Sequence, residues 1–238
     1  MRLLTWNCCG GPFSKKIPLL TSLAPDIAVL PECPKPETEC DTRLWFGENR
    51  HKGIAVLTSP RYRIRALSLE PNVPKFAFPL EVTGPVNFRL LVIWSKGKQP
   101  YRYVMGIVKA IQMYRHVIEG LPTVVIGDFN SNAIWDSWHS PDLNHSALVK
   151  LLGDLGLVSS YHYFYGETYG AETRPTFYLH KNVARSYHID YCFVPEAWAS
   201  HIQSVQIGSD DKWQKYGDHR PLLVHLNLSE QQDAQVTH

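Results

Sequence analysis

The chain has 238 residues and a mass of 27.2 kDa, and its composition is 44% apolar and 19% charged. This composition is typical of a globular protein that can bury a sizeable core, and it excludes a disordered chain and a coiled coil. With 24 basic and 22 acidic residues the net charge is only +2, so the overall charge does not indicate a nucleic-acid partner. A nucleic-acid partner would have to be bound by local groups of basic residues.

The cysteines, the apolar segments and the first residues exclude further classes. Five cysteines, an odd number without C-x-x-C spacing, argue against a disulfide framework and a structural zinc site. The apolar stretch at residues 90–94 is far shorter than the ~18–20 residues that cross a membrane, so we expect no membrane partner. The first seven residues contain no apolar segment followed by a small-residue cleavage site. We therefore expect a cytoplasmic protein, and a monomer.

In chain order, the hydrophobic pattern predicts a strand over residues 2–8, a helix over 14–23 that is interrupted by Pro18, and a buried strand over 26–32. These three elements form a β-α-β unit. An antiparallel meander follows, its strands separated by proline and glycine. The meander strands are predicted over residues 53–58, 61–69, 76–82 and 87–94.

A second helix-then-strand unit begins with apolar residues at helical spacing over residues 103–119, followed by a buried strand over 123–126. Asn144 is expected to cap another helix, which runs to Leu155 and stops at Gly156. Further strands are predicted over residues 157–161, 188–194, 202–207 and 221–228. Residues 1–228 are expected to form one domain, and residues 229–238 a flexible polar tail. Many short strands with few helices indicate two packed sheets flanked by helices.

Small polar clusters lie at the ends of five of these strands. Loops at strand ends hold reactive side chains on a rigid scaffold, although each cluster alone could equally be a turn, a cap or a solvated strand end. In chain order the clusters are Thr5-Trp6-Asn7, Leu30-Pro31-Glu32, Gly127-Asp128-Phe129-Asn130, His188-Ile189-Asp190-Tyr191 and Gly217-Asp218-His219-Arg220-Pro221.

Taken together and in this order, the five motifs resemble the endonuclease/exonuclease/phosphatase superfamily, which includes exonuclease III-like, AP endonuclease and deoxyribonuclease I-like enzymes. The likeness spans residues 5–221, nearly the whole chain. It implies a four-layer α/β sandwich of two mixed, mostly antiparallel sheets, packed face to face and flanked by helices. It also implies divalent-metal phosphodiester hydrolysis at one edge of the two sheets.

The resemblance implies catalytic roles for four residues. Asp128 would orient or deprotonate the attacking water, and Asn130 would donate an amide hydrogen bond to a phosphate oxygen. His219 would contact the scissile phosphate. Asp190 would hold the His219 ring in the productive tautomer and raise its pKa, by the logic of catalytic Asp-His pairs.

The resemblance also implies a metal site. Glu32 matches the family's metal-binding position, with Asn7 nearby, and Asp218 would complete the site or serve a second ion. Mg²⁺ prefers oxygen ligands of this kind, and the same ligands suit Mn²⁺. We therefore expect Mg²⁺ or Mn²⁺ as the cofactor.

Further residues are candidates for substrate binding, each with an alternative. Tyr101 or Ser95 is a candidate for the Tyr or His that many relatives carry before the long helix. His188 either contacts phosphate or packs as a strand-end histidine. The indoles of Trp135 and Trp138 either stack on nucleobases or anchor their loop.

Lys96 and Lys181 lie in loops near the motifs, and such side chains supply most contacts to a nucleic-acid backbone. The leading hypothesis is therefore a DNA nuclease, acting as a 3′–5′ exonuclease, at abasic sites or as a nonspecific endonuclease. The alternative is hydrolysis of a small or lipid phosphate, as by inositol phosphatases and sphingomyelinases. A non-enzymatic binding module is a third hypothesis, which the presence of all the principal catalytic candidates disfavours.

Overall fold

The computed structural model describes residues 1–74, 76–97, 102–208 and 210–228. Six strands form the first sheet, in which β1 runs parallel to β2 and every other pair is antiparallel. The strands are β1 (Arg2–Thr5), β2 (Ile27–Cys33), β3 (Arg43–Asn49), β4 (Lys52–Thr58), β13 (Ile202–Ile207) and β14 (Leu222–Leu226), in the order β13-β14-β1-β2-β4-β3. Helix α1 (Ile17–Leu23) joins β1 to β2, which confirms the β-α-β unit.

Six other strands form the second sheet, in which β7 and β8 are the parallel pair. The strands are β5 (Arg63–Ala66), β6 (Ala77–Thr83), β7 (Phe88–Trp94), β8 (Thr123–Asp128), β9 (Leu157–Ser159) and β12 (Asp190–Pro195), in the order β5-β6-β7-β8-β12-β9. Helices α2 (Val104–Met113) and α3 (Arg115–Gly120) connect the parallel pair, so the second helix-then-strand unit is also present.

The remaining helices and strands complete the described chain. The helices are η1 (Phe13–Lys15), η2 (Ala133–Trp138), α4 (His145–Asp154), α5 (Ser160–Tyr165), η3 (Leu179–Lys181), α6 (Glu196–Ala199), α7 (Asp210–Trp213) and η4 (Gln214–Tyr216). A separate two-stranded antiparallel hairpin consists of β10 (Phe177–Tyr178) and β11 (Ser186–Tyr187). None of the helices in the described ranges is both long enough and apolar enough to span a bilayer.

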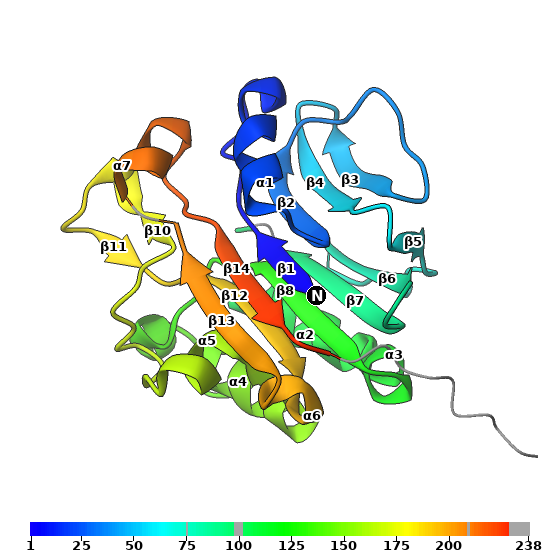
Figure 1. The fold of residues 1–238 in the computed structure, drawn as a ribbon. Helices are drawn as coiled ribbons and strands as arrows, with labels where there is room; N and C mark the ends of the chain where they lie inside the picture. Colours follow the sequence, from blue (N-terminus) through cyan, green and yellow to red (C-terminus); the bar gives the residue numbers. More distant parts are fainter. Residues whose placement is uncertain (75, 98–101, 209, 229–238) are drawn as a thin grey trace, which may run out of the picture.

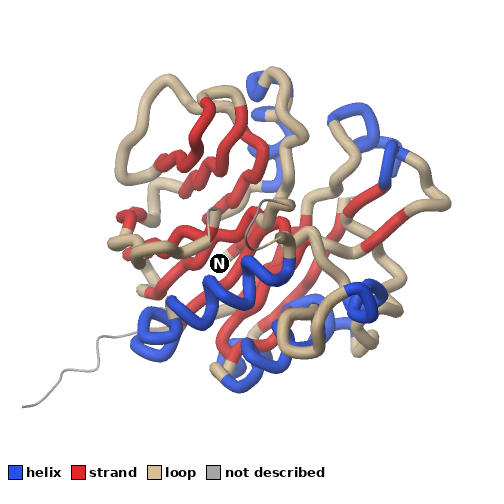
Figure 2. Tube along the Cα trace, turned by 180° about the vertical axis from the view of Figure 1, so that it is seen from behind, coloured by secondary structure: helices blue, strands red, loops and turns tan. Residues whose placement is uncertain are grey.

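Alternation along the strands separates four layers (Figure 1). Leu3 of β1 lies in the cluster between the two sheets, together with Leu90 of β7, whereas its neighbour Leu4 lies in a cluster with Leu20 of α1. A third cluster joins the second sheet to α2, α3 and α4, and Figure 2 shows helices in front of these strands. The chain is therefore a four-layer α/β sandwich, as predicted.

Some predicted elements differ from the structure. The helix over residues 103–119 breaks at Tyr114, whose ψ of 14° departs from helical geometry and whose ring is buried. The strand over residues 157–161 ends at Ser159, and the aromatic residues that follow form α5 because Tyr161 packs into the core while Tyr163 faces solvent. The first meander strand, β4, belongs to the first sheet, where it pairs with β2 and β3.

Strand β3 has no counterpart among the predictions. It lies at the edge of the first sheet, and none of its residues is fully buried. Its apolar residues Leu44, Trp45 and Phe46 are consecutive and only partly buried, so the strand lacks the period-two hydrophobic alternation on which strand prediction depends.

The cap predicted at Asn144 is present, and it provides a test of the fold. The Asn144 side chain accepts a hydrogen bond of 2.8 Å from the backbone N–H of Ala147, in the first turn of α4. Asn144→Ala should lower the free energy of unfolding by about 1 kcal/mol, measured by urea denaturation. Asn144→Ser, which keeps a capping oxygen, is the matched control. Equal stability of the Ala and Ser variants would contradict the assignment.

Candidate active site

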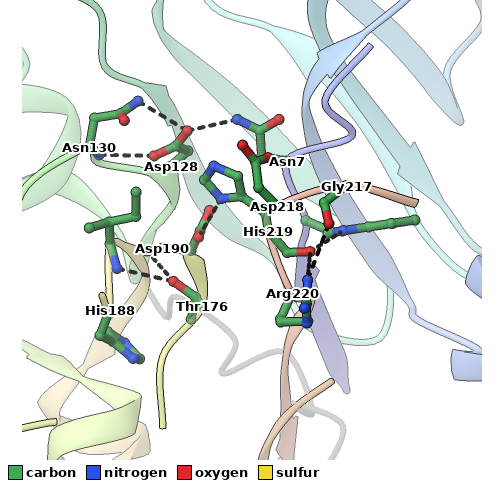
Figure 3. A network of polar contacts seen from close by, with 12 residues as sticks. Asn7, Asp128, Asn130, Thr176, His188, Asp190, Gly217, Asp218, His219 and Arg220 are labelled. Atoms are coloured by element: carbon green, nitrogen blue, oxygen red, sulfur yellow. Dashed lines mark hydrogen bonds and ion pairs between the residues drawn. The ribbon is translucent and has the colours of Figure 1, made fainter. Parts of the chain in front are cut away.

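The strand-end motifs that contain Asn7, Asp128, Asp190 and His219 lie close together (Figure 3). Asp128 ends β8 and Asp190 begins β12, and the two residues are direct partners in the antiparallel register. His219 lies between η4 and β14, and Asn7 follows β1. Figure 3 shows the His219 ring beside both carboxylates. Residues more than 200 positions apart in the chain therefore form one cluster.

The glycine before Asp128 is required by the packing of the second sheet. Gly127 has a φ of 146°, and a Cβ at this position would collide with the carbonyl oxygen of Ile93 in β7. Only glycine adopts this conformation readily and allows so close an approach between the two strands. The motif's glycine thus places Asp128 at the edge of the sheet.

A buried ion pair joins Asp190 to His219. The distance from Asp190 Oδ2 to His219 Nδ1 is 2.9 Å, and the two side chains are 0% and 6% exposed. The backbone N–H of Asp190 donates to Thr176 Oγ1 at 3.0 Å, and Phe177 of β10 forms a β-bridge with His219. The indole N–H of Trp6 donates to the His219 carbonyl at 3.4 Å. Both partners of the pair are therefore held by backbone contacts.

Asp128 is held by two asparagines. Asn7 Nδ2 donates to Asp128 Oδ2 at 2.8 Å, and the backbone N–H of Asn130 donates to Asp128 Oδ1 at 2.9 Å. The Asn130 side-chain amide donates to Asp128 Oδ2 at 3.1 Å and to the Ser95 carbonyl at 3.0 Å. In this arrangement Asn130 orients Asp128, in addition to the phosphate contact that the resemblance implies.

The pKa values of Asp128 and His219 are both raised in the site. Burial raises the pKa of Asp128 to about 7, and the Asp190 carboxylate adds to this rise. Burial opposes a charge on His219, but the carboxylates of Asp190, Asp128 and Asp218 outweigh it and raise the pKa of His219 to about 9. At pH 7.5 the cluster therefore pairs an imidazolium with a carboxylate whose pKa suits a general base.

The three residues expected to hold a metal supply oxygen atoms. Glu32 has a φ of 58° at a bulge in β2, and its carboxylate lies 2.7 Å from Lys52 Nζ. Asp218 Oδ1 accepts a hydrogen bond from the Cys9 thiol at 2.8 Å, and Asn7 Oδ1 accepts one from the Cys9 backbone N–H at 2.9 Å. Two carboxylates and an amide oxygen suit a hard divalent cation, and the Glu32 carboxylate already attracts a cationic group.

A second group of residues also has the composition of a metal site. Asp128, Asp190 and His219 offer ligand atoms that lie within 4.8 Å of one another. Among the described residues, the buried Oδ1 of Asp190 has no hydrogen-bond partner. His219 Nδ1 and Asp190 Oδ2 are engaged in the ion pair, which leaves His219 Nε2 and Asp190 Oδ1 as the atoms that these two residues could offer to an ion.

His188 packs in the core, and this arrangement favours the alternative of a packed strand-end histidine over a contact to phosphate. Its Nδ1 lies 2.9 Å from the Arg174 carbonyl, and its ring centroid is 4.2 Å from that of Tyr161. Burial lowers the pKa of His188 to about 4, so the ring is neutral at pH 7. Period-two alternation does not bring His188 to the face of Asp190, because β12 begins at Asp190 and does not extend back to His188.

The other substrate-binding candidates have different environments. The ammonium of Lys96 lies over two rings, 3.3 Å from the Trp94 centroid and 3.5 Å from the Phe76 centroid. Tyr101 lies outside the described residues, and its alternative Ser95 is buried. Trp138 in η2 is 75% exposed and stacks on Trp135, with ring centroids 6.2 Å apart.

Several residues of the site have no signal in the sequence. Thr176 and Phe177 hold Asp190 and His219, but they lie outside the five motifs and reach the site only through pairing between distant segments. Lys52 reaches Glu32 across the β2–β4 ladder. Cys9, two residues after Asn7, is the one residue that proximity to a motif could have identified.

Solved structures with the same fold include several nucleases. A 3′-5′ exonuclease from Neisseria meningitidis has a TM-score of 0.65 and 19% sequence identity, and the match covers 96% of this chain and 100% of that protein. A 3′ phosphatase from Neisseria, bound to product DNA hairpin, has a TM-score of 0.66, 17% identity and the same coverage. An AP endonuclease from Archaeoglobus fulgidus has a TM-score of 0.70 and 16% identity, also covering 96% and 100%.

At these identities the likeness shows the fold. It confirms that the chain shares its fold with these nucleases. Neither a protein-family model nor a curated protein sequence matches the chain.

The protonation state of His219 tests the electrostatics of the site. Without metal, we expect the ring signals of His219 in an NMR titration to show no transition between pH 6 and 8, because the neighbouring carboxylates raise its pKa to about 9. In Asp190→Asn the pKa of His219 should fall, because one of the carboxylates that stabilise its charged form is lost while the effect of burial remains. The exposed Asp154→Asn is the matched control. A wild-type transition near pH 6.5 would contradict the assignment.

Proposed function

We propose that the chain is a divalent-metal-dependent phosphodiester hydrolase that acts as a DNA nuclease. The observation that carries this proposal is the buried cluster of Asp128, Asp190 and His219, in which a base of raised pKa faces a protonated imidazole. Proteins that share the fold are a 3′-5′ exonuclease, a 3′ phosphatase bound to product DNA and an AP endonuclease, and they support the choice of DNA.

Asp128 acts on the attacking water. A carboxylate whose pKa is about 7 is substantially ionised at neutral pH and is still basic enough to accept a proton from water. Asn7 and Asn130 fix its two oxygens, so the carboxylate has one orientation toward the water. Pre-orientation of this kind removes the entropic cost of placing the base at the moment of reaction.

His219 acts on the phosphate. Its Nδ1 is bound to Asp190, so the nitrogen left to face substrate is Nε2. A protonated Nε2–H donates a charge-assisted hydrogen bond to a phosphoryl oxygen, where negative charge increases in the transition state. Asp190 keeps the ring charged and oriented, and it acts through His219 without contacting substrate itself.

Glu32, Asn7 and Asp218 would hold the metal, which we propose to be Mg²⁺ or Mn²⁺. Bound there, the ion would neutralise charge on the phosphoryl oxygens. The proposal includes a monomeric enzyme located in the cytoplasm, as expected from the sequence, and a role in the repair of DNA.

Asp128→Asn tests the proposed base. The amide keeps the size of the side chain but cannot accept the proton, so metal-dependent cleavage of end-labelled DNA should fall by about 10²–10⁴-fold. Single-stranded, double-stranded, abasic-site and 3′-phosphate DNA are compared with Mg²⁺, Mn²⁺ or EDTA, and EDTA should abolish the wild-type activity. The exposed Asp142→Asn is the matched control, and circular dichroism confirms folding.

The products separate the remaining alternatives. A stepwise ladder indicates 3′–5′ digestion, and internal fragments indicate an endonuclease. Intact DNA under every metal, together with release of choline phosphate or inorganic phosphate from lipid or inositol substrates, would overturn the nuclease proposal in favour of the small-phosphate alternative.

A further inference from the structure

An unbroken row of aromatic rings runs from the protein surface to His219. It starts at Trp138 and Trp135 in η2, whose ring centroids are 6.2 Å apart. It continues from Trp135 to Tyr187 of β11 at 5.1 Å, and from Tyr187 to Phe177 of β10 at 6.4 Å. Phe177 lies 4.7 Å from the His219 ring. We call these four residues, Trp138, Trp135, Tyr187 and Phe177, the aromatic row.

The two ends of the aromatic row differ in exposure. His219 is 5% exposed, Phe177, Tyr187 and Trp135 are partly buried, and Trp138 is 75% exposed. A side chain as exposed as Trp138 buries little apolar area, so it contributes little to the anchoring of its own loop. Its ring is instead available to a ligand.

Polar contacts already anchor η2. Asn132, which caps it, donates to Glu172 Oε2 at 3.0 Å and to the His188 carbonyl at 2.9 Å. Asp136 Oδ1 accepts a hydrogen bond of 2.8 Å from the backbone N–H of His145 at the start of α4. The loop is therefore held from both sides without the indole of Trp138, and the alternative that this residue anchors the loop is disfavoured.

We propose that the aromatic row is a stacking platform for unpaired nucleobases of the strand that is cleaved. The proposal rests on the proposed nuclease function and names its substrate class, a single-stranded nucleic acid or a single-stranded end. A strand whose phosphate lies at His219 brings its neighbouring bases over Phe177 and the rings beyond. Bases within a duplex are already stacked on both faces, whereas unpaired bases are free to stack on aromatic side chains.

The surroundings of the platform suit a nucleic-acid backbone. Lys181 and Arg185 are exposed in the connection between β10 and β11, the two strands that carry Phe177 and Tyr187. Cationic side chains beside aromatic rings are the combination that binds single strands with little sequence preference. We therefore expect the enzyme to bind single strands of any base sequence but to bind a backbone without bases more weakly.

Trp138→Ala tests the platform on two substrates of equal length. One is single-stranded oligothymidylate, and the other is an oligomer of abasic spacers, which has the same phosphodiester backbone without bases. The variant should lower kcat/KM on oligothymidylate by about 5- to 150-fold and leave the rate on the spacer oligomer unchanged. Trp138→Phe should retain most of the activity, and the exposed Tyr163→Ala is the matched control.

Two results would overturn the platform while the nuclease proposal stands: cleavage of oligothymidylate unaffected by Trp138→Ala, or an equal loss on both substrates. A loss on duplex DNA as large as that on oligothymidylate would overturn the single-stranded substrate class. Quenching of tryptophan fluorescence by oligothymidylate is measured in parallel. Quenching that depends on Trp138, in a protein that cleaves neither substrate, would support the platform and overturn the nuclease proposal.

Discussion

The structure of the site depends on the ion pair between Asp190 and His219. Two aspartates face each other across the β8–β12 ladder in the interior, an arrangement in which both cannot easily be charged. The imidazolium of His219 compensates the Asp190 charge at a distance of 2.9 Å. Asp128 is buried beside this carboxylate, and its pKa is raised as a result. The ion pair thus supports both the charged donor of His219 and the raised basicity of Asp128, the two properties that the proposed hydrolysis uses.

Neighbouring segments of the fold position Asp190 and His219 and keep the pair buried. Strand β10 contributes a backbone bridge to His219, and Thr176, directly before that strand, contributes a hydroxyl to the backbone of Asp190. Phe177 of the same strand begins the aromatic row, so one segment both positions His219 and forms the surface next to it. Asn7 and Glu32 lie at the carboxyl ends of the parallel strands β1 and β2, and the hydrogen bond from Asn7 to Asp128 joins this end of the first sheet to the second.

Much of this arrangement is present in the sequence, and the exceptions have physical causes. The number of short apolar strands predicted two packed sheets, the resemblance of the polar motifs implied the four layers, and the same motifs predicted Asp128, Asp190 and His219. The edge strand β3 was not predicted because its apolar residues are consecutive and only partly buried. The helix α5 was not predicted because its aromatic residues are typical of a strand, and the packing of Tyr161 into the core decides its structure. Thr176 and Lys52 act through pairings between distant segments, which local sequence does not encode.

A double-mutant cycle tests most directly whether Asp190 acts through His219. Cleavage of DNA by wild type, Asp190→Asn, His219→Ala and the double variant is compared under one set of metal conditions. If the two residues function as a unit, the double variant loses no more activity than His219→Ala alone. Losses that multiply would show that the two residues act independently, and they would contradict a mechanism in which Asp190 keeps the His219 ring charged and oriented.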